Sequence, residues 1–142
     1  MNYDNSCFYN DYILDEIITL YQNDDAILIF VADHGEEVFD NEPIHGRCFN
    51  TPNAAIAKNE YEVPMWIWCS NSYKEKHRDI TKLIERSTHK PFITDKISSL
   101  LFYISGIYSK YYSEEDCVIS PKYKTNDRYI YGNVNYDSLN IQ

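Results

Sequence analysis

The sequence predicts an α/β fold, and three features carry this prediction. Two continuous apolar runs of strand length, at 26–32 and 63–70, are typical of strands that helices cover on both faces, as in a mostly parallel sheet flanked by helices. Segments with helical periodicity lie before the first run and after the second. The chain has 142 residues, of which 44% are hydrophobic, so it can form its own core, and we expect a single domain over 1–142.

The first element is expected to be a helix from about Tyr3 to Tyr21. Its apolar residues recur with the spacing of one helix face, and they are Ile13, Leu14, Ile17, Ile18 and Tyr21. The polar segment "QNDD" at 22–25 interrupts this pattern, and the first apolar run follows directly. The chain therefore starts with a helix and a strand joined by a short turn.

Residues 37–62, between the two strands, are expected to form a long functional loop. They contain Pro43, Pro52 and Gly46 together with several asparagines, all of which interrupt regular elements. After the second strand, residues 71–90 are highly charged and only weakly helical in pattern. They predict a helix on the surface that is exposed to solvent.

The clearest helix is predicted at 95–105. Thr94 is a good N-cap residue, apolar residues recur every three to four positions, and Gly106 marks the end. The tail beyond this helix is rich in tyrosine, aspartate, lysine and asparagine. It predicts no more than short strands, at 117–119 and 129–131.

The composition limits the partners of the chain. Its 13 Lys and Arg residues against 22 Asp and Glu leave a formal charge of −9, which repels polyanions and argues against nucleic acid as a partner. No apolar run approaches the roughly 20 residues that cross a bilayer, and the first residues lack the pattern of a signal peptide. We therefore expect the chain itself to be soluble. Neither a metal-type spacing nor a pairing can be assigned to the cysteines, Cys7, Cys48, Cys69 and Cys117.

The polar residues directly after the first strand are the candidate functional site. In open α/β sheets, ligands bind outside the carboxyl ends of the strands, where Asp33 and His34 would lie. A carboxylate and an imidazole can bind a divalent cation, and Gly35 permits the tight turn that lets the two side chains converge. A second imidazole, His45, is followed by Gly46 and could fold back from the loop over the same strand end.

A structural interpretation of these residues stays open. Asp33 would then cap a helix, and His34 would be a half-buried residue with its hydrogen bonds satisfied. Two more acids, Glu36 and Glu37, come next. They could be hydrogen-bonding partners of the ligands, but adjacent acids after a strand are more often solvated or capping a turn. We therefore leave both glutamates out of the predicted ligand set.

The order of several motifs resembles that of a known family. "VADHGEE" is followed by "IHG" and "EYEVPMWIWCS", with "YDNSCFYNDYILDEII" upstream and "KPFITDKISSLLFYISGI" and "VISPKY" downstream. Together these motifs cover nearly the whole chain. The combination closely resembles the C-terminal part of the phosphoethanolamine transferases of the sulfatase and alkaline phosphatase superfamily. The resemblance implies the C-terminal portion of an alkaline-phosphatase-like three-layer sandwich.

The resemblance also implies a chemistry. Asp33 and His34 look like two ligands of the catalytic zinc, and His45 looks like the histidine that holds the phosphoryl group. In these enzymes a threonine takes phosphoethanolamine from a phospholipid donor and passes it to a glycolipid acceptor such as lipid A, at the periplasmic face of the inner membrane. Zinc lowers the pKa of the hydroxyl and neutralises charge on the phosphoryl oxygens, so an acidic protein can handle an anionic headgroup.

Part of the family pattern has no match in 1–142. The nucleophilic threonine, a glutamate ligand and another histidine of the family come from sequence upstream, so no catalytic nucleophile is assigned here. Two ligands are fewer than zinc takes from protein, so we expect weak or absent zinc binding and no activity for the chain alone. A missing N-terminal half would then be a partner. Without it, the apolar face on which that half would pack would stay exposed and favour self-association. The alternatives are a sulfatase or phosphodiesterase of the same superfamily, or a degenerate, non-catalytic α/β interaction module.

Overall fold

The computed structural model describes residues 2–41, 43–47 and 53–139. Within these ranges, the strands form three antiparallel pairs, which join β1 to β4, β2 to β3 and β5 to β6. The elements follow in the order α1 (Asn2–Tyr21), β1 (Ile27–Val31), β2 (Glu37–Val38), β3 (His45–Gly46), α2 (Ala54–Tyr61), β4 (Met65–Cys69), α3 (Asn71–Lys76), α4 (Arg78–Glu85), the 3₁₀ helix η1 (Thr94–Lys96), α5 (Ile97–Ser105), β5 (Tyr129–Ile130), β6 (Val134–Asn135) and the 3₁₀ helix η2 (Tyr136–Ser138).

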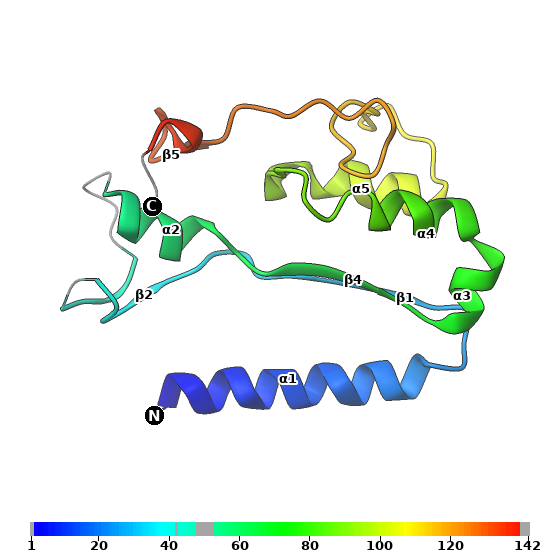
Figure 1. The fold of residues 1–142 in the computed structure, drawn as a ribbon, viewed down its shortest axis with the longest axis horizontal. Helices are drawn as coiled ribbons and strands as arrows, with labels where there is room; N and C mark the ends of the chain where they lie inside the picture. Colours follow the sequence, from blue (N-terminus) through cyan, green and yellow to red (C-terminus); the bar gives the residue numbers. More distant parts are fainter. Residues whose placement is uncertain (1, 42, 48–52, 140–142) are drawn as a thin grey trace.

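β1 and β4 form the centre of the fold, with Ile29 opposite Ile67. The expected α/β architecture is confirmed, because α1 lies on one side of this pair and α4 and α5 lie on the other, as three layers (Figure 1). The expected parallel orientation is wrong for these two strands. Apolar runs report burial and carry no information on direction. The chain between β1 and β4 begins and ends at the same edge of the pair, where Ala32 N donates to Pro64 O at 3.2 Å.

Both faces of the β1–β4 pair take part in packing. Met65 and Ile67 contact the core cluster on the side of α4 and α5. Because side chains alternate along a strand, Phe30 and Trp66 belong to the opposite face, where their rings stack with centroids 5.3 Å apart. Two-sided packing explains why the strands are apolar at every position.

The main core lies where α4 and α5 meet the segment that follows α5. Its fully or nearly fully buried members are Leu100, Cys117, Val118 and Ile119. The surface helix predicted at 71–90 is confirmed as α3 and α4, although α4 packs an apolar face against this core. The strand expected at 117–119 is wrong, because these residues form turns. Their apolar character reflects burial.

The predicted end of the helix at 95–105 is confirmed, whereas its predicted start is wrong. Gly106 follows α5 with a left-handed φ of 66°. Thr94 is not the N-cap: it begins η1, and Lys96 occupies the N-cap position of α5. The short strand expected at 129–131 is confirmed as β5.

The segment 37–62 is more regular than the predicted loop. β2 and β3 form a hairpin in which Val38 lies opposite His45. α2 then begins after Asn53, whose side chain accepts a 2.9 Å hydrogen bond from Ala55 N. A helix of 8 residues repeats its apolar pattern too few times for periodicity to reveal it, and tertiary packing supplies most of its stability.

α1 is confirmed as the first helix, and much of its surface is exposed. Its apolar stripe is half-buried at Leu14, Ile17 and Ile18, whereas the Phe8 side chain is 78% exposed. Across the described ranges, no helix combines the length and apolar content that crossing a bilayer requires.

The cysteines that the structure describes carry free thiols. Cys7 is exposed, whereas Cys69 and Cys117 are buried, and burial raises the pKa of both buried thiols. Cys48 lies outside the described residues. The two buried thiols therefore act as small apolar side chains in packing.

Candidate functional site

Asp33 and His34 lie just past the carboxyl end of β1, as predicted. His34 N donates to Asp33 Oδ1 at 3.0 Å, which turns the carboxylate toward its neighbour. His34 Nδ1 lies 3.0 Å from the carbonyl oxygen of Gly35. Because a carbonyl oxygen only accepts, Nδ1 carries the proton in this contact, and in a neutral ring Nε2 then has its lone pair for a ligand.

The two free donor atoms of this pair converge. His34 Nε2 lies 3.7 Å from Asp33 Oδ2. Two ligands bound to one tetrahedral zinc at about 2.0–2.1 Å lie roughly 3.3 Å apart, so a small side-chain adjustment would let both bind one ion. The side chains are accessible, with 91% of Asp33 and 37% of His34 exposed. No helix starts at Asp33, because the next regular element is β2, so the alternative in which Asp33 caps a helix is wrong. The half-buried His34, with one ring nitrogen hydrogen-bonded, agrees with the other part of that alternative.

The donor atoms fit zinc in kind and fall short in number. Oxygen and imidazole nitrogen are both common zinc ligands, but zinc sites take three or four ligands from protein. Within 2–41, 43–47 and 53–139, no group of three His, Cys, Asp or Glu side chains is placed to hold a metal ion. At this strand end the described residues therefore offer two zinc-type donor atoms, fewer than a zinc site takes from protein.

His45 belongs to a different element, the β2–β3 hairpin. Its side chain is exposed, and its ring centroid is 6.0 Å from that of Phe39. In the part of the chain that the structure describes, His45 does not join Asp33 and His34 in a three-residue metal-binding group. Its role in holding a phosphoryl group stays a prediction.

The turn that carries Asp33 and His34 is anchored on α2. Gly35 N donates to the carbonyl oxygen of Glu60 at 2.9 Å. A Cβ atom at position 35 would lie 2.0 Å from the carbonyl oxygen of Asn59. Glycine is therefore required here by the close approach of two backbones.

Glu37 differs from its predicted state. It is 0% exposed, although a solvated or capping residue was expected. Its carboxylate accepts hydrogen bonds from Asn41 N at 2.5 Å and from the side-chain amides of Asn41 and Asn59 at 3.1 Å each. A buried and an exposed acid look alike in sequence, and Asn59 is 22 residues away. No sequence signal could have identified this contact.

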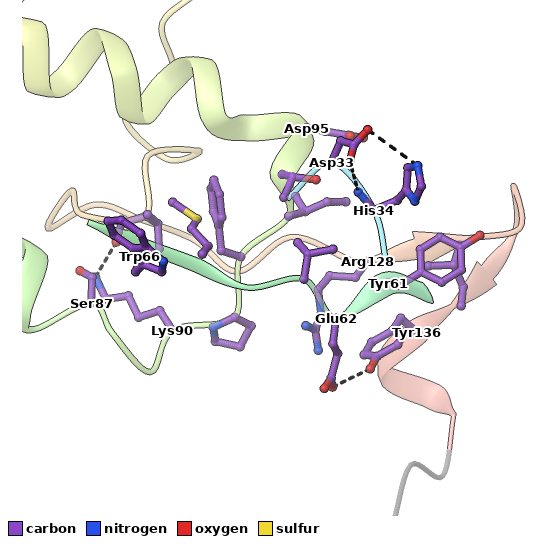
Figure 2. Close-up of a pocket in the computed structure, with 18 of the residues that line it drawn as sticks. Asp33, His34, Tyr61, Glu62, Trp66, Ser87, Lys90, Asp95, Arg128 and Tyr136 are labelled. Atoms are coloured by element: carbon purple, nitrogen blue, oxygen red, sulfur yellow. Dashed lines mark hydrogen bonds and ion pairs between the residues drawn. The ribbon is translucent and has the colours of Figure 1, made fainter. Parts of the chain in front are cut away.

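A cavity of about 680 Å³ begins at Asp33 and His34 (Figure 2). β4 and the connection between α4 and η1 supply much of its apolar wall, and β5 and η2 line it from the C-terminal segment. His45 is not among the described residues that line it. A ligand held at the Asp33–His34 pair would therefore have a half-open, partly apolar space beside it.

Polar pairs fix the wall that the C-terminal segment contributes. Arg128 Nε donates to Asp137 Oδ1 at 3.1 Å, and this hydrogen bond holds the pKa of the Asp137 carboxyl below its usual range. The Tyr136 hydroxyl donates to Glu62 Oε1 at 2.6 Å (Figure 2). Burial, and then the hydrogen bond to Glu62, raise the pKa of Tyr136. No sequence pattern marked these residues, because their partners come from separate segments.

Comparison with known proteins finds similarity along most of the chain. The family model described as Sulfatase matches residues 1–101. The phosphoethanolamine transferase EptA of Helicobacter pylori is 38% identical over 78 residues, which are 53% of this chain and 14% of that protein. The Kdo(2)-lipid A phosphoethanolamine 7''-transferase of Escherichia coli is 35% identical over 74 residues, or 52% of this chain and 12% of that protein. The chain thus matches a small part of each relative.

A solved structure extends the similarity to nearly the whole fold. The C-terminal periplasmic domain of EptC from Escherichia coli matches with a TM-score of 0.78 and 25% identity, over 97% of this chain and 40% of that chain. Another structure of that domain, with the same score and coverage, is a complex with zinc. The α/β architecture described above is therefore similar to part of that domain.

Proposed function

Because the chain belongs to the sulfatase family, we propose that it is the C-terminal portion of a phosphoethanolamine transferase with a glycolipid acceptor of the lipid A type. The names of the relatives support the transfer reaction and the acceptor class. The match to a periplasmic domain supports action in the periplasm. The proposal adds a phospholipid headgroup as donor and a place at the periplasmic face of the inner membrane, as the family resemblance implies. The observation that carries the proposal is the 3.7 Å approach of His34 Nε2 to Asp33 Oδ2 at the end of β1.

In this proposal Asp33 and His34 hold zinc through Oδ2 and Nε2, and His45 binds the phosphoryl group. The zinc complex of the similar domain supports the choice of metal. Zinc, when bound, supplies charge neutralisation at phosphoryl oxygens and a lowered hydroxyl pKa. The hydrogen bond from His34 Nδ1 to Gly35 O orients the ring so that Nε2 faces Asp33.

We expect 1–142, as one domain, to supply only part of the catalytic site. Two protein ligands bind zinc weakly, because affinity rises with the number of ligands that the fold holds in place. No residue of 1–142 matches the family's nucleophilic threonine. The chain by itself is therefore expected to transfer no headgroup.

A zinc titration followed by NMR tests the metal assignment, because chemical shifts report even millimolar binding. We expect zinc to shift the resonances of Asp33 and His34, and Asp33→Ala and His34→Ala to remove the effect. His77→Ala is the matched control, since His77 and Asp25 form a similar exposed pair with Nε2 and Oδ1 3.4 Å apart. Lys76 Nζ lies 3.1 Å from Asp25 and should repel a cation there. Shifts that survive Asp33→Ala, or no shift at His34 in the unaltered chain, would overturn the assignment.

A transfer assay tests the expected inactivity. The chain is incubated with zinc, a fluorescent phosphatidylethanolamine and lipid A, and the labelled products are separated. We expect no labelled or modified lipid A. Transfer by 1–142 without another polypeptide would contradict the proposed division of the site.

A further inference from the structure

The buried carboxylate of Glu37 connects two segments of the candidate site, the β2–β3 hairpin and α2. It is called the hub below. Among the described residues, three N–H groups donate to its two oxygens: the backbone amide of Asn41 and the side-chain amides of Asn41 and Asn59. An ionised carboxylate only accepts hydrogen bonds, so it satisfies all these donors at once. Since burial of such a group is unfavourable unless it is hydrogen-bonded, these contacts hold the surrounding backbone in one arrangement.

Asn59 connects this hub to the turn that carries Asp33 and His34. Its side chain donates to Glu37 Oε2 at 3.1 Å, while its backbone carbonyl oxygen lies against Gly35. The next carbonyl of α2, that of Glu60, accepts the 2.9 Å hydrogen bond from Gly35 N. A single turn of α2 therefore holds both the Asp33–His34 turn and the start of the β2–β3 hairpin.

The same hub reaches His45 through the hairpin. Glu37 lies opposite Gly46 in the β2–β3 pair, and the next residue, Val38, lies opposite His45. The hairpin is closed by a 3.0 Å hydrogen bond from Phe39 N to Ile44 O. A displacement of Glu37 would therefore move the strand that carries His45.

We infer that Glu37 and Asn59 are positioning residues that fix the Asp33–His34 turn and the His45 hairpin on α2. Glu37 touches neither a metal nor a substrate in this role. Its carboxylate ties β2 to Asn59, and Asn59 ties that contact to the backbone of Gly35. We call these linked contacts of Glu37, Asn59 and Gly35 the clamp. Its value for catalysis rests on the proposed function, whereas the contacts themselves are a property of the fold.

An exchange of the two side-chain types tests the clamp. Asn59→Asp places a second carboxylate against Glu37, so the contact becomes repulsive. Adding Glu37→Gln restores an amide–carboxylate pair with the roles reversed. The Asn41 side-chain amide, which also donates to Glu37 Oε2, can flip so that its oxygen accepts the second N–H of the introduced amide. Any effect of a new charge on α2 itself would persist in the double variant, whereas an effect on the clamp would be reversed. Leu100→Val is the control for a general loss of stability, because Leu100 is buried in the separate core.

Amide hydrogen exchange at pH 8 measures the clamp directly. In Asn59→Asp we expect the amides of Gly35 and Phe39 to exchange roughly tenfold faster or more, because a hydrogen bond to a charged group is lost. The amide of Ser70, which donates to Ala26 O at the other end of the central strands, should keep its rate. The double variant should return Gly35 and Phe39 to near their original rates. Unchanged rates in Asn59→Asp, or fast rates that persist in the double variant, would overturn the clamp.

The ring nitrogens of His34 report whether the clamp positions the site. ¹⁵N chemical shifts should show a proton on Nδ1 in the unaltered chain, because Nδ1 donates to Gly35 O. We expect a mixture of tautomers in Asn59→Asp, a return to the first pattern in the double variant, and no change in Leu100→Val. A His34 pattern that stays constant while Gly35 exchanges faster would overturn the positioning role. Neither measurement requires metal, so a failed zinc titration would count against the proposed function and leave the clamp intact.

Discussion

Gly35 and Glu60 are joined by a 2.9 Å hydrogen bond from the amide of the first to the carbonyl oxygen of the second. The last carbonyls of a helix have no partner within the helix, so Gly35 satisfies one that α2 leaves open. The bond places the turn after β1 directly on the last turn of α2. The position of Asp33 and His34 is therefore set by a helix that follows them by some 20 residues in the sequence.

Gly35→Ala is expected to destabilise the protein by about 1–3 kcal/mol, as overpacking typically does. The added Cβ would meet the backbone oxygen of Asn59 at 2.0 Å, and backbone cannot rotate away as a side chain can. Urea unfolding measures the change. Gly106→Ala is the control: it has open space but a left-handed φ of 66°, so about 1 kcal/mol is expected from strain alone. A Gly35→Ala variant that is more stable than Gly106→Ala would contradict the close approach.

Leu100→Ala and Leu101→Ala form a matched pair on α5. Leu100 is 0% exposed in the main core, whereas Leu101 is 47% exposed. Thermal or urea unfolding should show a loss of about 2–5 kcal/mol for Leu100→Ala, because a cavity is left behind. For Leu101→Ala we expect about 1 kcal/mol or less. Equal losses would mean that the core is not packed around Leu100.

Asp137→Asn should reduce stability in a pH-dependent way. The hydrogen bond from Arg128 lowers the pKa of Asp137 in the folded state. A carboxyl with a lowered folded pKa contributes stability above its unfolded pKa, near 4, and loses that contribution as pH falls through the folded pKa. The pair is partly exposed, so we expect only about 0.2–1 kcal/mol at pH 7.

Urea unfolding at pH 7 and below pH 3 measures this dependence. The difference between Asp137→Asn and the unaltered protein should shrink at the lower pH, because protonation of Asp137 makes its side chain neutral, as that of asparagine is. Asp15→Asn, at an exposed position of α1, removes the same charge and serves as control. A difference for Asp137→Asn that grows as pH falls would contradict the sign.

The sequence predicted the elements whose pattern is long or strongly apolar. The stripe of α1, the apolar runs of β1 and β4, and the periodicity and terminal glycine of α5 each indicated an element that the structure confirms. Position relative to β1 also sufficed to place Asp33 and His34 at a strand end. The local signal failed for α2, which is short, and for 117–119, where apolar residues are buried in turns.

By itself, the sequence determined that Asp33 and His34 follow an apolar strand, because covalent adjacency and hydrophobic patterning are local properties. Only the tertiary structure decided that β1 and β4 run antiparallel, that Glu37 is buried among asparagine amides, and that α2 supports the turn at Gly35. Burial drives an apolar strand into a core without fixing its direction, and a hydrogen bond between distant segments leaves no periodic trace in either of them.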